Sequence, residues 1–426
     1  MKIKTRNLSY DEVMALPRPE HKPPRKPNAL LRLGFRLASA PDLKATRFSY
    51  TSEDMEKVGE GPYLILMNHS SFIDLEMATR IFRDKPYCIV CTSDGFVGKE
   101  GLMRGVGCIP TNKFATDMSL MSDMFEAIHK LGCSVLLYPE ASYTFDGTAT
   151  PLPRGLGMML KRLDAPVVSV QTQGAFSRDP LYNLLQKRDV TVTARVKGLL
   201  SREELKEKSN AELDAVLDEL YSFDNFRWQQ ENRVSIPEPF RADGLERILY
   251  KCPHCAAEAR TEGKGTELRC HACGKVWELD EYGFLRAQEG ETEFSHIPDW
   301  YAWERQQVKR ELEEGSYLLD IPAEIGMLVD FKAVYMIGEG RLRHDLTGFT
   351  LDGAEGKLHF VRPANQCYSL YADYYWYELG DIICIGDQNT QYYCFPKQPT
   401  PVAKARLATE ELYKLRRAAR KKKKAE

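Results

Sequence analysis

The stretch that decides the fold lies at residues 63–74 and reads Tyr-Leu-Ile-Leu-Met-Asn-His-Ser-Ser-Phe-Ile-Asp. Its apolar part, residues 63–67, is too short for a helix and is typical of a buried strand. Ser70 and Ser71 can cap a helix that begins near Phe72. The stretch therefore predicts a core strand that runs directly into a helix.

The polar part of this stretch places a histidine and an aspartate five residues apart. We expect Asp74 to lie one turn into the helix and to reach back to the His69 ring. A carboxylate that holds a neutral imidazole leaves the other ring nitrogen free to accept a proton. Histidine has a reference pKa of ~6.5, which suits this work near neutral pH. The alternative is a hydrogen-bonded structural histidine at a strand end.

Three further blocks follow in order. Residues 107–113 read Gly-Cys-Ile-Pro-Thr-Asn-Lys, residues 134–142 read Ser-Val-Leu-Leu-Tyr-Pro-Glu-Ala-Ser, and residues 165–170 read Ala-Pro-Val-Val-Ser-Val. Together with the His-x4-Asp block they resemble the glycerolipid acyltransferases typified by 1-acyl-glycerol-3-phosphate acyltransferase. The resemblance covers about residues 45–200. It implies an α/β, glycerol-3-phosphate acyltransferase-like catalytic domain, which is a mixed sheet flanked by helices.

The resemblance also implies a reaction. His69 would deprotonate the acceptor hydroxyl, and Asp74 would orient the ring and stabilise the imidazolium. The acceptor would then attack the thioester of acyl-CoA or acyl-acyl carrier protein, and the thiol would leave. The implied acceptor is a lysophospholipid, with 1-acylglycerol-3-phosphate as the first candidate and phosphatidate as its product.

Two residues stand where the family binds its acceptor. Glu140 falls at the position of the acceptor-binding glutamate, and Lys113 stands where an arginine for the acceptor phosphate is usual. A lysine acts as a point charge for phosphate, without the two-pronged geometry of a guanidinium.

The third block departs from the family pattern. The family commonly reads Phe-Pro-Glu-Gly-Thr-Arg-Ser, whereas residues 138–144 read Tyr-Pro-Glu-Ala-Ser-Tyr-Thr. Ala141 adds a methyl group where glycine lets the backbone approach a ligand. Tyr143 removes a cation that would favour an anionic acceptor. We expect Arg154 to restore positive charge nearby.

A second signal is a pair of Cys-x2-Cys motifs separated by 14 residues, just below the usual spacing of about 15–20. Four thiolates close a tetrahedral site and predict a structural zinc ribbon. The ligands would be Cys252, Cys255, Cys270 and Cys273. His254 and His271 lie inside the motifs and are expected to face solvent. The many acidic residues around the ribbon argue against nucleic acid as its partner.

Another Cys-x2-Cys, at residues 88–91, has a different meaning. It lies in an apolar run typical of a strand, where residues three apart point to opposite faces. We expect Cys88 and Cys91 to be two separate buried thiols.

Composition sets the outer limits. The chain has 426 residues, enough for two or three domains, and a net charge of −2 that gives no general attraction to nucleic acid. The sequence lacks both a signal-peptide core and the ~18 consecutive apolar residues of a membrane span. Its 11 cysteines fit free thiols and metal ligands in a reducing cytosol. We expect a cytoplasmic protein, peripheral at the inner face of the membrane.

Two segments could meet an anionic membrane. Residues 17–27 form a proline-rich basic arm, and Asn28 can cap a helix with one leucine-rich face. That face can lie on a bilayer or pack on the catalytic domain. At the other end, the basic run 416–424 could add ~1 kcal/mol per residue at an anionic bilayer, or be a solvated end. Nucleic acid is its possible competitor.

Beyond about residue 315 the sequence is rich in short predicted strands, followed by a helix over about 400–417. The predicted strands are 332–338, 341–346, 357–361, 368–371, 382–385 and 391–395. This β-rich region closed by a helix resembles a pleckstrin-homology or GRAM-like domain in pattern. The expected division is 1–44 arm and helix, 45–235 acyltransferase domain, 236–300 zinc ribbon, 301–417 β-rich domain and 418–426 basic tail.

Two rival functions are open. In the first, the altered third block marks a degenerate site in a non-catalytic lipid-binding membrane adaptor. In the second, the zinc ribbon and the basic tail belong to a nucleic-acid-binding protein. The presence of both His69 and Asp74 favours the enzyme.

Overall fold

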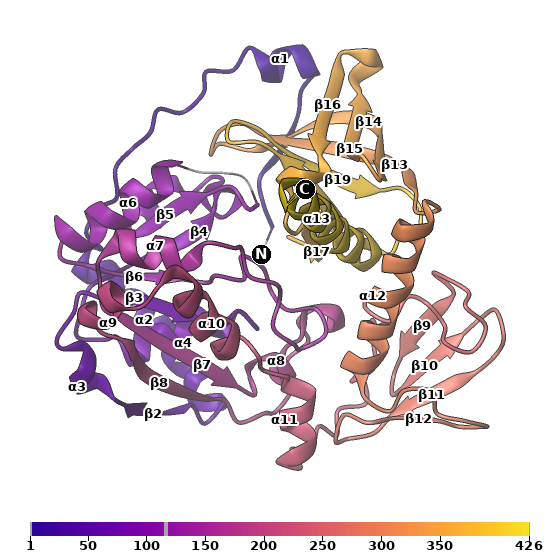
Figure 1. Ribbon diagram of the computed structural model, residues 1–426, viewed down its shortest axis with the longest axis horizontal. Coiled ribbons are helices and arrows are strands. Elements are labelled where there is room, and N and C mark those ends of the chain that lie inside the picture. Colours follow the sequence, from indigo (N-terminus) through magenta and orange to yellow (C-terminus); the bar gives the residue numbers. More distant parts are fainter. Residues whose placement is uncertain (1, 115–117, 426) are drawn as a thin grey trace.

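The computed structural model describes residues 2–114 and 118–425, and side chains other than those of 118 and 421–425. Three sheets form within these residues (Figure 1). A seven-stranded sheet with flanking helices carries the His-Asp stretch, a four-stranded sheet carries the cysteine motifs, and an eight-stranded sheet is built mainly by the C-terminal third. The chain is a mixed α/β structure with a β-rich region that ends in a helix, as the sequence predicts.

The seven-stranded sheet has the order β2-β8-β7-β3-β6-β4-β5. All its described pairings are parallel except that between β7 and β8. Both faces of the central strands are covered, so their sequences are continuous apolar runs rather than alternating ones. The strands are β2 (Ser49–Glu53), β3 (Leu64–Met67), β4 (Tyr87–Thr92), β5 (Cys108–Thr111), β6 (Ser134–Leu137), β7 (Val167–Gln173) and β8 (Thr193–Leu200).

Two apolar cores enclose this sheet, one on each face. Cys88 lies in one core with Leu64, while Cys91 packs against the other with Ile65. The expectation that these two thiols face opposite sides is confirmed, although Cys91 is half-buried. The flanking helices are α3 (Met55–Val58), α4 (Ile73–Ile81), α5 (Glu100–Gly105), α6 (Met118–His129), α7 (Leu156–Leu163), α8 (Ala175–Arg178), α9 (Arg202–Glu207) and α10 (Asn210–Leu220). Helix α11 (Asn225–Glu231) follows, and its Phe226 belongs to a separate core shared with the cysteine-bearing region.

The N-terminal segment contacts both the eight-stranded sheet and the helices of the seven-stranded sheet. Strand β1 (Thr5–Asn7) pairs in parallel with a strand of the eight-stranded sheet, and helix α1 (Tyr10–Met14) follows. Residues 17–27 then form neither helix nor strand and lead to α2 (Ala29–Ala45), which packs against α4 beside the seven-stranded sheet. The Asn28 side chain accepts hydrogen bonds from the N–H groups of the first turn of α2, so the predicted cap is confirmed.

The cysteine motifs lie around an antiparallel sheet of order β12-β11-β10-β9. Its strands are β9 (Thr261–Lys264), β10 (Glu267–Cys270), β11 (Val276–Leu279) and β12 (Leu285–Ala287). Helix α12 (Ile297–Glu314) follows. Trp277 of the sheet packs edge-on against Trp300 of this helix at 5.0 Å between ring centroids, which fixes the small sheet to α12.

The C-terminal sheet has the order β16-β15-β14-β13-β19-β18-β17, with β1 beside β14. The prediction of two strands at 332–338 and 341–346 is wrong, because one long strand, β14, covers both. Strands β13 and β15 were not predicted. The elements are β13 (Leu319–Leu328), β14 (Val334–Asp345), β15 (Gly348–Gly353), β16 (Leu358–Pro363), β17 (Tyr371–Trp376), β18 (Gly380–Gly386), β19 (Gln391–Pro396) and α13 (Val402–Ala425).

Helix α13 continues beyond the predicted 417 to Ala425, so its backbone includes residues 418–425 of the basic tail. The side chains of 421–425 lie outside the described ones, so the role of the tail stays a prediction. Short 3-10 helices occur at Ser93–Phe96, Leu181–Asn183, Leu245–Arg247, Ala354–Gly356 and Ala364–Gln366.

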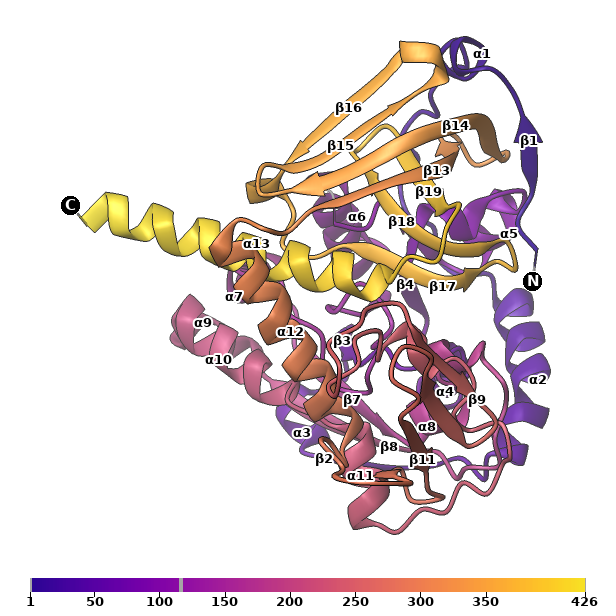
Figure 2. The same ribbon diagram turned by 90° about the vertical axis from the view of Figure 1, so that its right-hand side faces the viewer.

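The eight-stranded sheet and α13 together form the C-terminal body of the molecule. This body contacts the end of the seven-stranded sheet that carries His69. Asp94, in the turn after β4, accepts hydrogen bonds from the Tyr371 hydroxyl at 2.9 Å and the Trp376 indole at 3.1 Å, both from β17. Figure 2 shows α13 crossing between the two sheets, next to α12 and β17. The fold therefore places residues from distant parts of the sequence around one site.

Candidate active site

His69 and Asp74 form the pair expected from the sequence. Strand β3 ends at Met67, α4 begins at Ile73, and the short turn between them brings Asp74 Oδ2 to 3.0 Å from His69 Nδ1. The same oxygen accepts the backbone N–H groups of Ser70 at 2.8 Å and Ser71 at 3.1 Å. A neutral ring that donates from Nδ1 leaves Nε2 as the proton acceptor.

The expected serine cap differs in detail. Phe72 is the N-cap of α4 and its side chain makes no capping bond, whereas Ser71 Oγ accepts the N–H of Ile73 at 3.3 Å. The Asp74 carboxylate takes the N–H groups of the preceding turn. The residue placed to hold the histidine therefore also holds the turn that presents it.

The His69 ring lies between two tyrosines. The ring centroids of Tyr138 and Tyr143 each lie 4.0 Å from that of His69, at interplanar angles of 25° and 30°. Phe72 packs against the outer side of Tyr143 at 5.7 Å. The His69 side chain is 15% exposed. The ring is thus fixed on both faces as well as at Nδ1.

Burial sets the protonation of this pair. It holds the pKa of His69 well below its ordinary value of 6.5, and the positive charge of Lys113 lowers this pKa further. Burial also raises the pKa of Asp74 to about 7, against the opposing effect of the Ser71 and Ser70 N–H groups. At neutral pH the imidazole is therefore unprotonated and able to act as a base.

Glu140 lies in the turn after β6 and is 1% exposed. Its Oε2 accepts the backbone N–H of His69 at 3.0 Å, and its Oε1 accepts the N–H of Thr150 at 2.9 Å. Burial raises the pKa of Glu140 to about 7, while these donors favour the charged form. Glu140 thus links the histidine turn to the loop at residue 150, and its expected contact with an acceptor stays a prediction.

Lys113 lies beneath the C-terminal body. Its Nζ is 4.0 Å from the centroid of the Tyr371 ring, a cation–π contact. Burial lowers the pKa of Lys113, and the carboxylates of Asp94 and Asp373 oppose that shift. A cation is therefore present near His69, but neighbouring acids and an aromatic ring already surround it.

Arg154 does not join the other predicted residues. It makes an ion pair with Asp218 at 3.2 Å, and both side chains are more than half exposed. Among the described residues, no contact between Arg154 and His69 or Glu140 is found. Asp218 lies on α10, which packs against α7 close to Arg154, and this provides a nearer partner than the site does.

Three residues at the site could not be expected from its motifs. Arg406 of α13 contacts the loop that carries Tyr143, while Tyr371 and Asp373 of β17 face Lys113. The sequence carries no signal that pairs these residues with the first 200. The stacking of Tyr143 on His69 was not predicted either. Its signal in the sequence is the pair of tyrosines at 138 and 143, on either side of Glu140.

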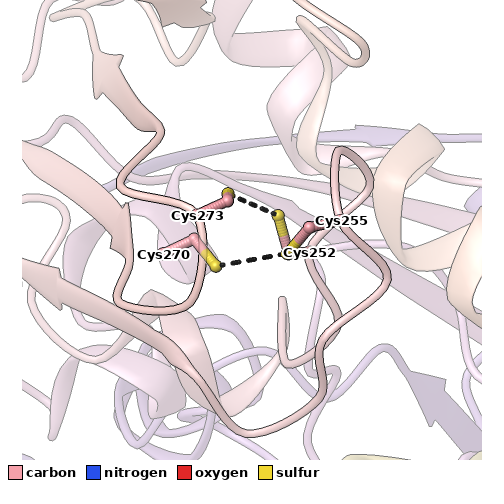
Figure 3. A group of neighbouring side chains, drawn as sticks. All are labelled: Cys252, Cys255, Cys270 and Cys273. Carbon is pink, nitrogen blue, oxygen red and sulfur yellow. Dashed lines mark hydrogen bonds between the residues drawn. The ribbon is translucent and has the colours of Figure 1, made fainter.

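The four cysteines of the two motifs converge (Figure 3). Their Sγ atoms all lie within 4.8 Å of one another, with Cys252–Cys273 and Cys255–Cys270 separations of 3.8 Å. Four sulfurs that each lie ~2.3 Å from one zinc ion form a tetrahedron with edges of ~3.8 Å. The donor set and its spacing fit zinc.

The two histidines inside the cysteine motifs lie at the surface. His254 Nδ1 is 3.4 Å from a Glu293 carboxylate oxygen, and His271 Nε2 is 2.7 Å from one of Glu262. Both therefore point to acidic partners rather than into the sulfur cluster, as expected.

Comparisons with known proteins point to acyl transfer. Residues 49–173 match the Acyltransferase family model, and this stretch contains His69, Asp74, Lys113 and Glu140. The chain is 27% identical over 140 residues to the 1-acyl-sn-glycerol-3-phosphate acyltransferase beta of Homo sapiens. The match covers 32% of this chain and 49% of that protein, so the chain spans about half the length of this curated relative.

Among solved structures, the 1-acyl-sn-glycerophosphate (LPA) acyltransferase PlsC from Thermotoga maritima is similar with a TM-score of 0.32 and 15% identity. The alignment covers 45% of this chain and 76% of that chain. The family match and the curated relative support an acyltransferase. No helix within residues 2–114 and 118–425 has the length and apolarity that crossing a membrane requires.

Proposed function

We propose that this protein transfers a fatty acyl group from an acyl thioester to the hydroxyl of a lysophospholipid. The observation that carries the proposal is the buried His69–Asp74 pair, with 3.0 Å between Nδ1 and Oδ2, in the stretch that matches the Acyltransferase family. The names of the similar proteins support 1-acylglycerol-3-phosphate as the acceptor, with phosphatidate as the product.

The chemistry follows from the state of the ring. His69 Nε2 takes the proton of the acceptor hydroxyl as its oxygen attacks the thioester carbonyl. Asp74 Oδ2 stabilises the imidazolium that forms at the other nitrogen. The tetrahedral intermediate then expels the thiolate, which takes the proton back from Nε2. An ester bond forms and a thioester bond breaks, without an acyl-enzyme.

Lys113 supports an anionic acceptor through its charge. It lowers the pKa of His69, so its field reaches the ring, and a phosphate between the two would be attracted. Asp94, Asp373 and the Tyr371 ring compete for the same cation. The acceptor is therefore best identified by a direct comparison between an anionic and a zwitterionic lysolipid.

The acceptor test measures thiol release from a long-chain acyl-CoA and from the matching acyl-acyl carrier protein, with vesicles present. Lysophosphatidate is compared with lysophosphatidylcholine at equal concentration. Faster release with lysophosphatidate supports the anionic acceptor. Release with lysophosphatidylcholine alone supports acyl transfer as the function but contradicts lysophosphatidate as the acceptor. Release with neither lipid and neither carrier favours the lipid-binding adaptor.

Two further parts of the proposal concern the rest of the chain. Cys252, Cys255, Cys270 and Cys273 would hold a structural zinc ion, since four thiolates leave no open position for a substrate. Helix α2 and the basic tail would hold the protein at the anionic inner face of a membrane. Leu30, Leu33 and Leu37 of α2 are 78%, 42% and 64% exposed, which supports the first of these contacts.

A further inference from the structure

Arg406 of helix α13 reaches from the C-terminal body to the loop that flanks His69. Its side chain is buried, with 3% exposed. Nη1 donates a hydrogen bond to the Tyr143 carbonyl at 3.3 Å, and Cζ lies 4.4 Å from the centroid of the Phe145 ring. One guanidinium thus contacts this loop by a hydrogen bond and by a cation–π interaction.

The same loop contacts His69 in two ways. The Tyr143 ring covers one face of the imidazole at 4.0 Å, and the Thr144 N–H donates to the His69 carbonyl at 3.2 Å. Arg406 and His69 therefore contact the same three-residue segment, 143–145, from opposite ends of the chain. A shift of this segment would move or hydrate the ring.

Arg406 is itself held in place. Its Nε donates to Glu410 at 3.3 Å, one turn further along α13. Glu410 also accepts Arg305 of α12 at 2.6 Å and the Ser369 hydroxyl at 2.7 Å. The free-energy cost of burying the Arg406 charge is thus offset by the Glu410 carboxylate, which accepts hydrogen bonds from three donors. Helices α12 and α13, which carry these residues, contact each other and lie side by side in Figure 2.

We propose that Arg406 is a positioning residue for the His69 base, which makes α13 a part of the catalytic unit. The inference rests on the proposed acyl transfer. Arg406 holds segment 143–145, this segment holds the His69 ring dry and oriented, and the ring keeps its lowered pKa. The positive charge of Arg406 also opposes part of the burial effect on Glu140, in line with its closeness to the site.

The test substitutes Arg406→Gln in the full chain and uses two readouts. The first is kcat for acyl transfer, which we expect to fall about tenfold, because small misplacements of a catalytic group are costly, while KM for the thioester stays within twofold. The second is the NMR titration of His69, whose pKa we expect to move up toward 6.5. Arg406→Lys keeps a cation and a donor, and we expect it to recover part of both.

The matched control is Arg343→Gln. Arg343 lies on β14 of the eight-stranded sheet, is about half exposed, and donates from Nε to Asp345 at 3.0 Å, away from segment 143–145. We expect neither kcat nor the His69 titration to change in this variant. If Arg406→Gln does not fold, Phe145→Leu removes the aromatic face and keeps an apolar side chain, and we expect the same two changes.

A folded Arg406→Gln protein with unchanged kcat and unchanged His69 titration would overturn the inference and leave the proposed function in place. If the wild-type protein transfers no acyl group to any acceptor, the proposed function fails instead. The titration then still decides whether Arg406 positions the His69 ring.

Discussion

His69 combines an oriented ring with a lowered pKa, and each property has an identifiable cause. Orientation comes from Asp74 at Nδ1 and from the rings of Tyr138 and Tyr143 on the two faces. The lowered pKa comes first from burial and second from Lys113. A histidine kept neutral in this way can act as a base at lower pH than a free one, because less of it is protonated.

This gives a prediction for the pH dependence of acyl transfer. The base must be unprotonated and its aspartate ionised, so activity is lost in two steps as pH falls: near pH 7, where Asp74 takes a proton, and below pH 6.5, where His69 does. Lys113→Met removes a positive charge that lowers the pKa of His69, so the acid limb of kcat/KM should move to higher pH. Arg154→Met, at an exposed ion pair, serves as the control and should not move it.

The measurement is kcat/KM against pH for the three proteins. An acid limb well above pH 7 in the wild type would contradict this account of the His69–Asp74 pair. A limb that stays in place in Lys113→Met would show that Lys113 does not act on His69.

At the scale of residues, contacts between residues that are close in the sequence could be predicted, whereas contacts between distant residues could not. His69 and Asp74 are five residues apart on adjoining elements, so their pairing follows from the strand–helix pattern. Arg406 is 263 residues from Tyr143, and the contact exists because the C-terminal body rests on the catalytic sheet. Arg154 was expected at the site, but α10 brings Asp218 closer to it.

At the scale of elements, too, features set by the local sequence could be predicted, whereas features set by distant contacts could not. The central strands and the start of α2 could be predicted from apolar runs and from Asn28. Residues 202–220 form two helices, α9 and α10, because Ser209 and Glu212 form a capping box that starts the second one. Both capping boxes, at Ser201 and at Ser209, are visible in the sequence as Ser-x-x-Glu.

The two predicted strands in 332–346 merge for a reason that the sequence hides. Gly338 and Gly340 read as a turn, yet the backbone continues through them. At Gly340 a side chain would meet the Asp352 carbonyl at 2.3 Å, so the glycine permits close pairing with β15. Strand β14 takes up the irregularity with one extra residue, Ile337, because Ile325 and Gly326 of β13 pair with Gly338 and Met336.

Helix α2 gives a prediction about membranes. Burial of a leucine in a bilayer contributes about 2 kcal/mol, so Leu30→Glu with Leu37→Glu should weaken binding to phosphatidylglycerol-rich vesicles by more than about tenfold. Leu318→Glu, an exposed leucine of the C-terminal body, is the control. Co-sedimentation with vesicles measures the effect, and unchanged binding in the double variant would remove α2 from the membrane contact.

The cysteine cluster gives a prediction about metal. The purified protein should contain about one zinc ion per chain, and Cys270→Ser should lose it, because the remaining three thiolates do not close the site. Cys367→Ser, a buried thiol elsewhere, should keep it. Elemental analysis of the three proteins decides this, and full zinc retention in Cys270→Ser would contradict the assignment.

At the scale of the whole molecule, several segments surround the catalytic sheet. The N-terminal segment joins it to the C-terminal sheet through β1, and β17 and α13 cover its active end (Figures 1 and 2). The cysteine-bearing region supports this arrangement, since Glu258 pairs with Lys404 of α13 at 2.7 Å. The expected domain boundaries stay a prediction, but contacts across them join the N-terminal segment, the cysteine-bearing region and the loop beside His69 to the C-terminal sheet or to α13.

These contacts have a consequence for function. Helix α13 carries both Lys404, which faces the cysteine region, and Arg406, which faces the loop beside His69. We therefore expect loss of zinc from the cysteine cluster to shift α13 and, through Arg406, the loop beside His69. The shape of the C-terminal body could be predicted from the sequence only as a β-rich region closed by a helix, because sheet order depends on pairings between distant strands.

The central claim is that His69 is the base of an acyl transfer reaction. The most direct measurement is thiol release from a long-chain acyl thioester with lysophosphatidate and vesicles, comparing wild type, His69→Ala and His359→Ala. His359 also pairs with an aspartate, Asp352, at 2.6 Å, but lies exposed on the C-terminal sheet.

We expect His69→Ala to fold like the wild type and to lose acceptor-dependent release by at least about 10³-fold, whereas His359→Ala keeps it. Comparable release by His69→Ala and wild type would contradict the account.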